Sequence, residues 1–469
     1  MSAKPAWAPA FETYAEKLLA PYQIPGVSLA VAREGELIYH QGFGLRDTEE
    51  GLPLTLDTVM GIGSITKSFT CVAIMQLHEQ GKLNIHDPVV KYLPEFRTNT
   101  PAYTGQISIH HFMTHTSGLA PLPILFRSLY NSMKDDPAAR ERLEKRTEQV
   151  VPVETYEELM EAIAQSDIPM LGAPGTHFSY SNDGYALLGA IIERVSGKSY
   201  VQYMDDHILK PAGMTRSTLD LQRLAEWQDV TQLYAVRVNE GKEEVFPAPG
   251  WWQAPAMLAA GFLRCSTRDM LRYAEIYRTG GLVGGERILS EESVRLMTTP
   301  YAQPSPGMHY GYGLMLTPEY HGVSLVEHGG ALKGIAAWFT AVPEKGLTGV
   351  CLTNLAGGPS SQLLLGALNA ELGLPPATTR VAFKDQAPGS LEAYLGTYRS
   401  GEDEELKVLA EDGKMVVEYQ GRKWPARPVG EHTFAIRVKE LESAARFLFD
   451  ADRQVYAVAF HYRIIRKIA

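Results

Sequence analysis

The sequence predicts an α+β or α/β domain with a helical insertion, followed by a smaller all-β domain. Apolar runs of strand length occur near the N-terminus and again after about residue 310, and a long stretch with helical periodicity lies between them. The composition changes at 375–390, a loop-like stretch that contains proline. Beyond it, apolar and polar residues alternate with period two, which is typical of an antiparallel barrel or sandwich. We therefore expect two domains, residues 1–375 and residues 385–469.

The first predicted elements are a helix and a hairpin. Residues 9–20 carry apolar side chains at helical spacing and end before a proline. Residues 27–32 and 37–42 have the composition of strands, and the Glu34-Gly35 dipeptide between them is typical of a turn.

Two longer helices are expected in the middle of the chain. One runs over about residues 64–80, and Gly81 stands where helices often end on glycine. The other runs over about residues 184–195 and stops at Gly197.

A charged segment at 134–149 separates these helices. It contains five positive and five negative residues, which favours a solvated helix with i,i+4 ion pairs. Because it follows an apolar run at 121–129, a lid over an active site is the alternative.

The later part of the chain predicts two sets of strands. Apolar runs at 324–327, 335–342 and 349–352 indicate neighbouring buried strands of one sheet. In the second domain, strands are expected at 406–408, 415–419, 434–438, 446–449 and 455–462.

Composition excludes several classes of function. The 469 residues include 44 Lys and Arg against 54 Asp and Glu, a net charge of −10, which argues against a nucleic-acid or anionic-membrane binder. Three cysteines without paired spacing predict neither a disulfide framework nor a zinc or redox site, and no cofactor is expected. We see no signal peptide and no apolar run long enough to span a membrane, so we expect a cytoplasmic protein.

The first motif that carries chemistry is Ser64-Ile65-Thr66-Lys67. A serine hydroxyl is a poor nucleophile until a base takes its proton, and a lysine with a lowered pKa can be that base. On a helix, residues three apart share one face, so the amine can reach the hydroxyl. A buried lysine at the start of an apolar helix is unfavourable unless it is used.

Two further motifs contain polar side chains next to regular elements. Tyr180-Ser181-Asn182 lies at a loop-to-helix junction, where a tyrosine can relay protons and an asparagine can hold a carbonyl group; tyrosine packing and helix capping are the simpler explanation. His328-Gly329-Gly330-Ala331 lies on a predicted strand edge, where two glycines allow a substrate backbone to approach. An ordinary strand end explains this motif equally well.

In order and spacing, the three motifs resemble those of the penicillin-recognising serine hydrolases, which include class C β-lactamases, DD-peptidases, D-aminopeptidases and related esterases. Segments at 109–119, 174–189 and 260–269 also resemble sequences of this family, and the resemblance covers about residues 10–370. It implies a β-lactamase/transpeptidase-like α+β fold, in which an antiparallel sheet is flanked by helices and the site lies between it and an all-helical region. A small antiparallel β-barrel would follow.

The resemblance implies catalytic roles for three residues. Ser64 would be the acylated nucleophile and Lys67 the general base or its partner. Tyr180 would pass a proton to the leaving group and help to activate water.

The resemblance also implies substrate contacts. Asn182 would contact a substrate amide, and His328, Gly329 and Gly330 would line the binding site. The backbone N–H groups of Ser64 and Ala331 would form the oxyanion hole.

One departure from the family pattern bears on the substrate. His328 stands where the family's third motif usually has lysine, and an ordinary histidine is mostly uncharged at pH 7. This favours a peptidase or amidase with a preference for D-residues, acting on a small molecule or peptide. A carboxylesterase, a weak β-lactamase and a penicillin-binding sensor without turnover are the alternatives.

The second domain supports the same interpretation. Residues 391–398 resemble the opening of lipocalin-like barrels appended to some D-aminopeptidases and archaeal peptidases of this family, where the extra domain narrows the site or builds the oligomer. A barrel that only stabilises the chain is the alternative, and a homo-oligomer is left open.

Two residue clusters receive no catalytic role. His110, His111 and His115 could suggest a metal, but the resemblance places them at a structural helix start, so no metal is expected. Trp251-Trp252 could line a subsite, although such pairs are more often local packing.

Overall fold

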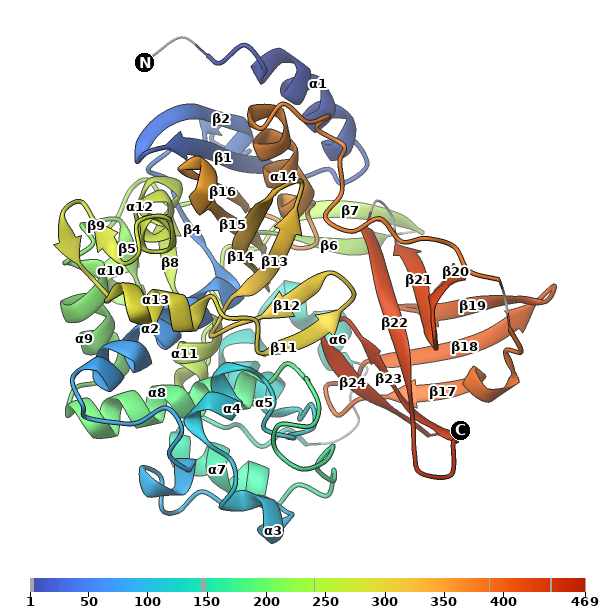
Figure 1. The fold of residues 1–469 in the computed structure, drawn as a ribbon. Coiled ribbons are helices and arrows are strands. Elements are labelled where there is room, and N and C mark those ends of the chain that lie inside the picture. The colour runs from blue at the N-terminus through green and yellow to red at the C-terminus, as the bar shows by residue number, and fades with distance from the viewer. Residues whose placement is uncertain (1–3, 145–148, 240, 388, 439–440, 469) are drawn as a thin grey trace.

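The computed structural model describes residues 4–144, 149–239, 241–387, 389–438 and 441–468 (Figure 1). It has an α+β unit built on a nine-stranded sheet, and a closed eight-stranded barrel beside it. The predicted fold class is therefore confirmed. The domain boundaries at 375 and 385 stay a prediction.

The large sheet joins the two ends of the α+β unit. Its strand order is β11-β12-β13-β14-β15-β16-β1-β2-β3, and β1 pairs with β16 in an antiparallel register. The sheet strands are β1 (Gly26–Arg33), β2 (Glu36–Asp47), β3 (Leu52–Pro53), β11 (Ala302–Ser305), β12 (Met308–Tyr310), β13 (Met315–Tyr320), β14 (Val323–Leu332), β15 (Ile335–Val342) and β16 (Leu347–Thr353). The predicted neighbourhood of the three late strands is confirmed, since β14, β15 and β16 are adjacent.

Both faces of the sheet are covered, as its apolar strands require. Along β1, Val27, Leu29 and Val31 pack against α1 (Ala8–Leu19) and α14 (Ser360–Glu371) on one face. Ala30 and Ala32 belong to the larger core on the other face, with α2 (Thr66–Glu79) and α12 (Thr267–Arg278). Because strand side chains alternate between faces, a strand covered on both sides becomes a continuous apolar run.

The helical insertion lies mainly between β4 and β8. The helices are α1 (Ala8–Leu19), α2 (Thr66–Glu79), α3 (Pro101–Thr104), α4 (Ile109–Met113), α5 (Ile124–Met133), α6 (Arg140–Glu144), α7 (Tyr156–Ala164), α8 (Asn182–Ser196), α9 (Tyr200–Met204), α10 (Leu221–Ala225), α11 (Leu258–Gly261), α12 (Thr267–Arg278), α13 (Glu291–Met297) and α14 (Ser360–Glu371). Small sheets are formed by β4 (Val59–Gly61), β5 (Ser217–Thr218) and β8 (Arg264–Ser266), by β6 (Tyr234–Asn239) and β7 (Lys242–Pro247), and by β9 (Leu282–Val283) and β10 (Glu286–Arg287). Among the described helices, none is both long and apolar enough to cross a membrane.

The two predicted long helices are present with one change. Ser64 lies in η1 (Gly63–Ile65), a 3-10 turn that leads directly into α2, and not in the α-helix itself. Ser181 caps α8 by accepting a hydrogen bond from the Gly184 backbone N–H, and α8 ends at Gly197 with φ 71°.

The charged segment only partly matches its prediction. It contains a 3-10 turn and the short helix α6, and residues 145–148 lie outside the described residues. The Asp136 side chain is buried and pairs with Lys333, so the segment is not simply a solvated face.

The C-terminal barrel contains three strands that the sequence pattern does not reveal. Its strands are β17 (Gly396–Arg399), β18 (Glu405–Glu411), β19 (Lys414–Tyr419), β20 (Arg422–Gly430), β21 (Thr433–Val438), β22 (Leu441–Phe449), β23 (Val455–Phe460) and β24 (Arg463–Lys467). β20 contains Pro425 and Pro428, which argue against a central strand. β17 and β24 are short and pair with each other to close the barrel, a contact without a local signal. The strand predicted at 455–462 ends at Phe460, and the chain then turns.

The barrel packs onto the α+β unit through side chains from both. One cluster joins Ala120 and Leu171 to Ala457 and Ile464. A second cluster places Tyr462, in the turn between β23 and β24, against residues beside the candidate site described below.

Candidate active site

The predicted site lies where β14 crosses η1. A Cβ atom on Gly330 would lie 1.8 Å from the Ile62 carbonyl oxygen and 3.0 Å from the Ser64 backbone nitrogen. Gly63, with φ 51°, faces the same crossing, because a Cβ there would lie 2.7 Å from the Ala331 backbone nitrogen. The two glycines therefore let the strand and the turn approach until the backbone groups of Ser64 and Ala331 are neighbours.

Lys67 is fully buried one helical turn after Ser64. Its Nζ lies 3.2 Å from Ser64 Oγ and donates to Asn182 Oδ1 (2.8 Å) and to the Ala260 carbonyl oxygen (2.5 Å). All three partners are neutral. Burial lowers the pKa of Lys67 well below its ordinary value, because the ammonium ion loses its hydration.

Tyr180 forms one wall beside this lysine. Lys67 Nζ lies 4.7 Å from the centre of the Tyr180 ring. The Tyr180 hydroxyl is buried and makes no hydrogen bond within the described residues. Burial raises the pKa of Tyr180, so Tyr180 is a phenol at neutral pH.

A hydrogen-bonded chain fixes the protonation of His328. The Ser181 backbone N–H donates to Nδ1 of His115 (3.0 Å), so Nε2 of His115 carries the proton and donates to the Tyr310 hydroxyl (3.2 Å). Tyr310 in turn donates to Nε2 of His328 (3.0 Å), and Nδ1 of His328 donates to the Gly329 carbonyl oxygen (2.6 Å). Backbone groups at both ends thus set the direction of the chain. Burial lowers the pKa of His328 to about 3, so this residue is neutral.

The histidine-rich segment divides into two parts. His110 bonds to Tyr312 and His111 completes the capping box of α4, as expected for a structural helix start. His115 lies beyond α4 with φ 57°, and its ring lies 4.1 Å from that of Tyr180. His115 therefore lies beyond the helix start that the resemblance implies, and tertiary packing brings it to the site. Within the described residues, no group of His, Cys, Asp and Glu side chains could hold a metal ion.

The barrel also reaches the site. The Tyr180 backbone N–H donates to the Tyr462 carbonyl oxygen (2.8 Å). Arg463 places its guanidinium carbon 4.7 Å from the centre of the Tyr180 ring and pairs with Glu402 at 2.8 Å. The sequence carries no local signal for either contact, since both residues belong to the second domain.

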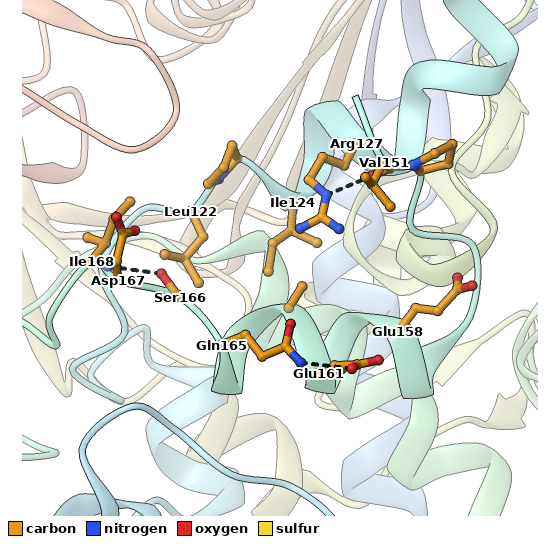
Figure 2. A pocket seen from close by; sticks show the side chains of 13 residues that line it. Leu122, Ile124, Arg127, Val151, Glu158, Glu161, Gln165, Ser166, Asp167 and Ile168 are labelled. Carbon is orange, nitrogen blue, oxygen red and sulfur yellow. Dashed lines mark hydrogen bonds between the residues drawn. The ribbon is translucent and has the colours of Figure 1, made fainter. Parts of the chain in front are cut away.

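Two other features lie apart from the motifs. Trp251 packs over Arg264, and Trp252 donates to Asp136, which agrees with local packing. A cavity of about 510 Å³ lies between α5 and α7 (Figure 2). None of the three predicted catalytic residues lines it. Some of its polar groups have structural partners: Arg127 donates to the Val151 carbonyl oxygen, and Gln165 donates to Glu161.

Comparison with known proteins agrees with this geometry. The family model described as Beta-lactamase matches residues 11–374. The chain belongs to the Beta-lactamase family. Protein flp of Staphylococcus aureus (strain MW2) is 26% identical over 346 residues, which cover 73% of this chain and 62% of flp. The chain thus spans less than two thirds of that relative's length.

Two solved structures resemble the whole chain. The octameric penicillin-binding protein homologue from Pyrococcus abyssi is 28% identical with a TM-score of 0.70, covering 98% of this chain and 100% of its own. SurE is 26% identical with a TM-score of 0.71, covering 99% of each chain. The resemblance therefore includes the C-terminal barrel.

Proposed function

We propose that this chain is a serine hydrolase that forms an acyl-enzyme on Ser64 and cleaves a peptide or amide with a D-residue. One observation carries the proposal. The Asn182 and Ala260 oxygens can only accept hydrogen bonds from Lys67, and the third partner, the Ser64 hydroxyl, can donate one. A neutral amine has two N–H donors and one lone pair, which matches this set of partners.

The first chemical step follows from that arrangement. Lys67 Nζ takes the proton from Ser64 Oγ as the oxygen attacks the substrate carbonyl carbon. The negative charge that develops on the carbonyl oxygen is stabilised by the N–H groups of Ser64 and Ala331, which the glycine crossing holds together. Asn182 orients Lys67 and lies where it can also contact the substrate.

Tyr180 serves the leaving group. Its hydroxyl is protonated and has no hydrogen-bond partner among the described residues, so it is free to donate to a departing amine. The proton that Lys67 has taken then restores the tyrosine. Water attacks the acyl-enzyme in the reverse sense and releases the acid product.

The substrate class is supported by the third motif and by relatives. His328 is neutral and buried, so this motif offers no fixed cation to the carboxylate of a penicillin or peptide C-terminus. SurE has also been solved with D-Leu. We further propose that the chain forms a homo-oligomer, because the Pyrococcus abyssi homologue is octameric.

The test compares wild type with Ser64→Ala on D-alanine p-nitroanilide, its L-enantiomer and p-nitrophenyl butyrate. We expect preferential cleavage of the D-anilide, abolished by the substitution. Cleavage of the ester alone would favour a carboxylesterase, and a stable adduct without turnover would favour a sensor. Activity that survives in Ser64→Ala would contradict the assignment of the nucleophile.

A further inference from the structure

The charged groups beside Lys67 come from an unexpected part of the molecule. The titratable side chains that face it, besides Tyr180, are Cys71 on its own helix, His115 beyond α4, Asp183 and Tyr185 on α8, His328 on β14, and Glu402 and Arg463 on the barrel. The α+β unit supplies five of these groups. The barrel supplies the other two.

Burial drives the five groups of the α+β unit toward their neutral forms, and it lowers the pKa of His115 well below its ordinary value. Burial raises the pKa of Cys71 to about 12, and it raises the pKa values of Asp183 and Tyr185 well above their ordinary ranges. Burial lowers the pKa of His328 to about 3, and the hydrogen-bonded chain through Tyr310 agrees with a neutral ring. Among the charged groups beside Lys67, Arg463 has the largest effect on its pKa, which it lowers, and Glu402 has the next largest effect, which raises it.

Backbone contacts hold Arg463 in place. It follows Tyr462, whose carbonyl oxygen accepts from the Tyr180 N–H, and it precedes Ile464, whose N–H donates to Ser179 Oγ (3.3 Å). The turn between β23 and β24 is thus pinned on both sides of Arg463 to the segment that contains Tyr180. The guanidinium group is mostly buried, with 17% of the side chain exposed.

Arg463 and Lys67 share one aromatic ring. Each charged group lies 4.7 Å from the centre of the Tyr180 ring, so the two cannot be further apart than twice that distance. We propose that Arg463 is a positioning residue: it supplies from the barrel the positive charge that the third motif lacks at His328, and so keeps Lys67 in its neutral, proton-accepting form. The inference rests on the proposed function, because it assigns Lys67 as the base.

Glu402 makes the proposal testable in both directions. Its carboxylate pairs with Arg463 and acts on Lys67 with the opposite sign, raising the pKa that Arg463 lowers. Removing the arginine charge should stabilise the protonated lysine, and removing the glutamate charge should destabilise it. If the Arg463–Glu402 pair only held the barrel in place, the two substitutions would not shift the pKa of Lys67 in opposite directions.

The experiment measures how fast a fluorophosphonate probe labels Ser64 as a function of pH. Labelling forms the Oγ–phosphorus bond, releases fluoride and needs the serine proton to be taken up. The labelling rate should fall on the acidic side of the pH profile, where Lys67 becomes protonated. We expect this acidic limb to move to higher pH by about one unit in Arg463→Gln and to lower pH in Glu402→Gln. In Arg463→Lys it should stay near its wild-type position. Arg422→Gln is the matched control, because the exposed Arg422–Glu243 pair also links the barrel to the α+β unit.

The outcomes separate this inference from the proposed function. An unmoved limb in both charge-removing variants, or shifts in the same direction, would overturn the role of Arg463 while leaving Ser64 as the nucleophile. A change confined to KM for carboxylate-bearing substrates would also overturn it, since that result indicates substrate binding. No adduct on wild-type Ser64 by mass spectrometry would overturn the proposed function and this inference with it. If Arg463→Gln fails to fold, the shift to lower pH in Glu402→Gln still decides the question.

Discussion

Lys67 and Lys333 are both buried, and they differ in what surrounds the amine. Lys67 has three neutral oxygen partners, and no carboxylate of the described residues forms a salt bridge with it. Lys333 donates to Asp136 Oδ2 at 2.6 Å and to the Gly250 carbonyl oxygen, and it lies over the Trp252 ring.

The carboxylate partner is what separates the two sites. Burial lowers the pKa of each lysine, but the Asp136 carboxylate opposes this effect at Lys333. An ion pair therefore keeps a buried lysine charged and structural, whereas neutral partners make it a base.

Lys67→Met should give the largest effect of the substitutions around these two sites. Without the base, Ser64 keeps its proton, and we expect kcat/KM to fall by about 10³-fold. The free energy of unfolding should fall less than in Lys333→Met, because the substitution leaves the buried Asn182 and Ala260 oxygens without a donor but leaves no buried charge unpaired. Steady-state kinetics measures the change in kcat/KM, and urea unfolding measures the change in the free energy of unfolding. A variant that is destabilised but active would reverse the assignment.

Lys333→Met should do the opposite. It leaves Asp136 buried without its cation, so we expect a loss of about 3–5 kcal/mol in unfolding free energy with little change in kcat/KM. Urea denaturation measures the loss. Adding Asp136→Leu should recover part of it, because the double variant leaves no unpaired charge. A large loss of kcat/KM in the fully folded single variant would contradict a structural role.

Tyr310→Phe should give a smaller effect on the Lys67 side. It removes the link between His115 and His328 and leaves a ring nitrogen of each without its partner, so we expect kcat/KM to fall by about tenfold. Tyr312→Phe is the matched control, because Tyr312 also bonds to a histidine, His110 (2.8 Å), outside this chain of bonds. Equal effects of the two substitutions on kcat/KM would show that the chain has no special role.

The sequence predicts the parts of this site that lie close together in the chain. The spacing from Ser64 to Lys67 places both on one face of a helical segment, and glycines mark the close crossing at Gly330. The resemblance to the penicillin-recognising serine hydrolases assigns the three motifs to one active site. Each of these inferences depends on residues a few positions apart in the sequence, or on a short motif that can be recognised without knowledge of the fold.

The remaining parts depend on tertiary contacts. Tyr310 joins His115 to His328 only because β12 and β14 lie in one sheet that packs against the segments containing His115 and Tyr180. Arg463 reaches Tyr180 only because the barrel closes and docks, and β24 itself has no clear strand pattern. Lys333 and Asp136 are 197 positions apart, so the charged segment looks solvated until the fold is known.

The most direct test of Lys67 as the catalytic base is a titration of the two buried lysines in the same sample. Protein labelled with 15N at lysine Nζ is followed by NMR across pH, with Lys67→Met and Lys333→Met used to assign the signals. We expect Lys67 to lose its proton at a clearly lower pH than Lys333 and to be an amine at the pH of maximal activity. If Lys67 is still an ammonium there, or titrates at or above Lys333, the assignment of Lys67 as the base is contradicted.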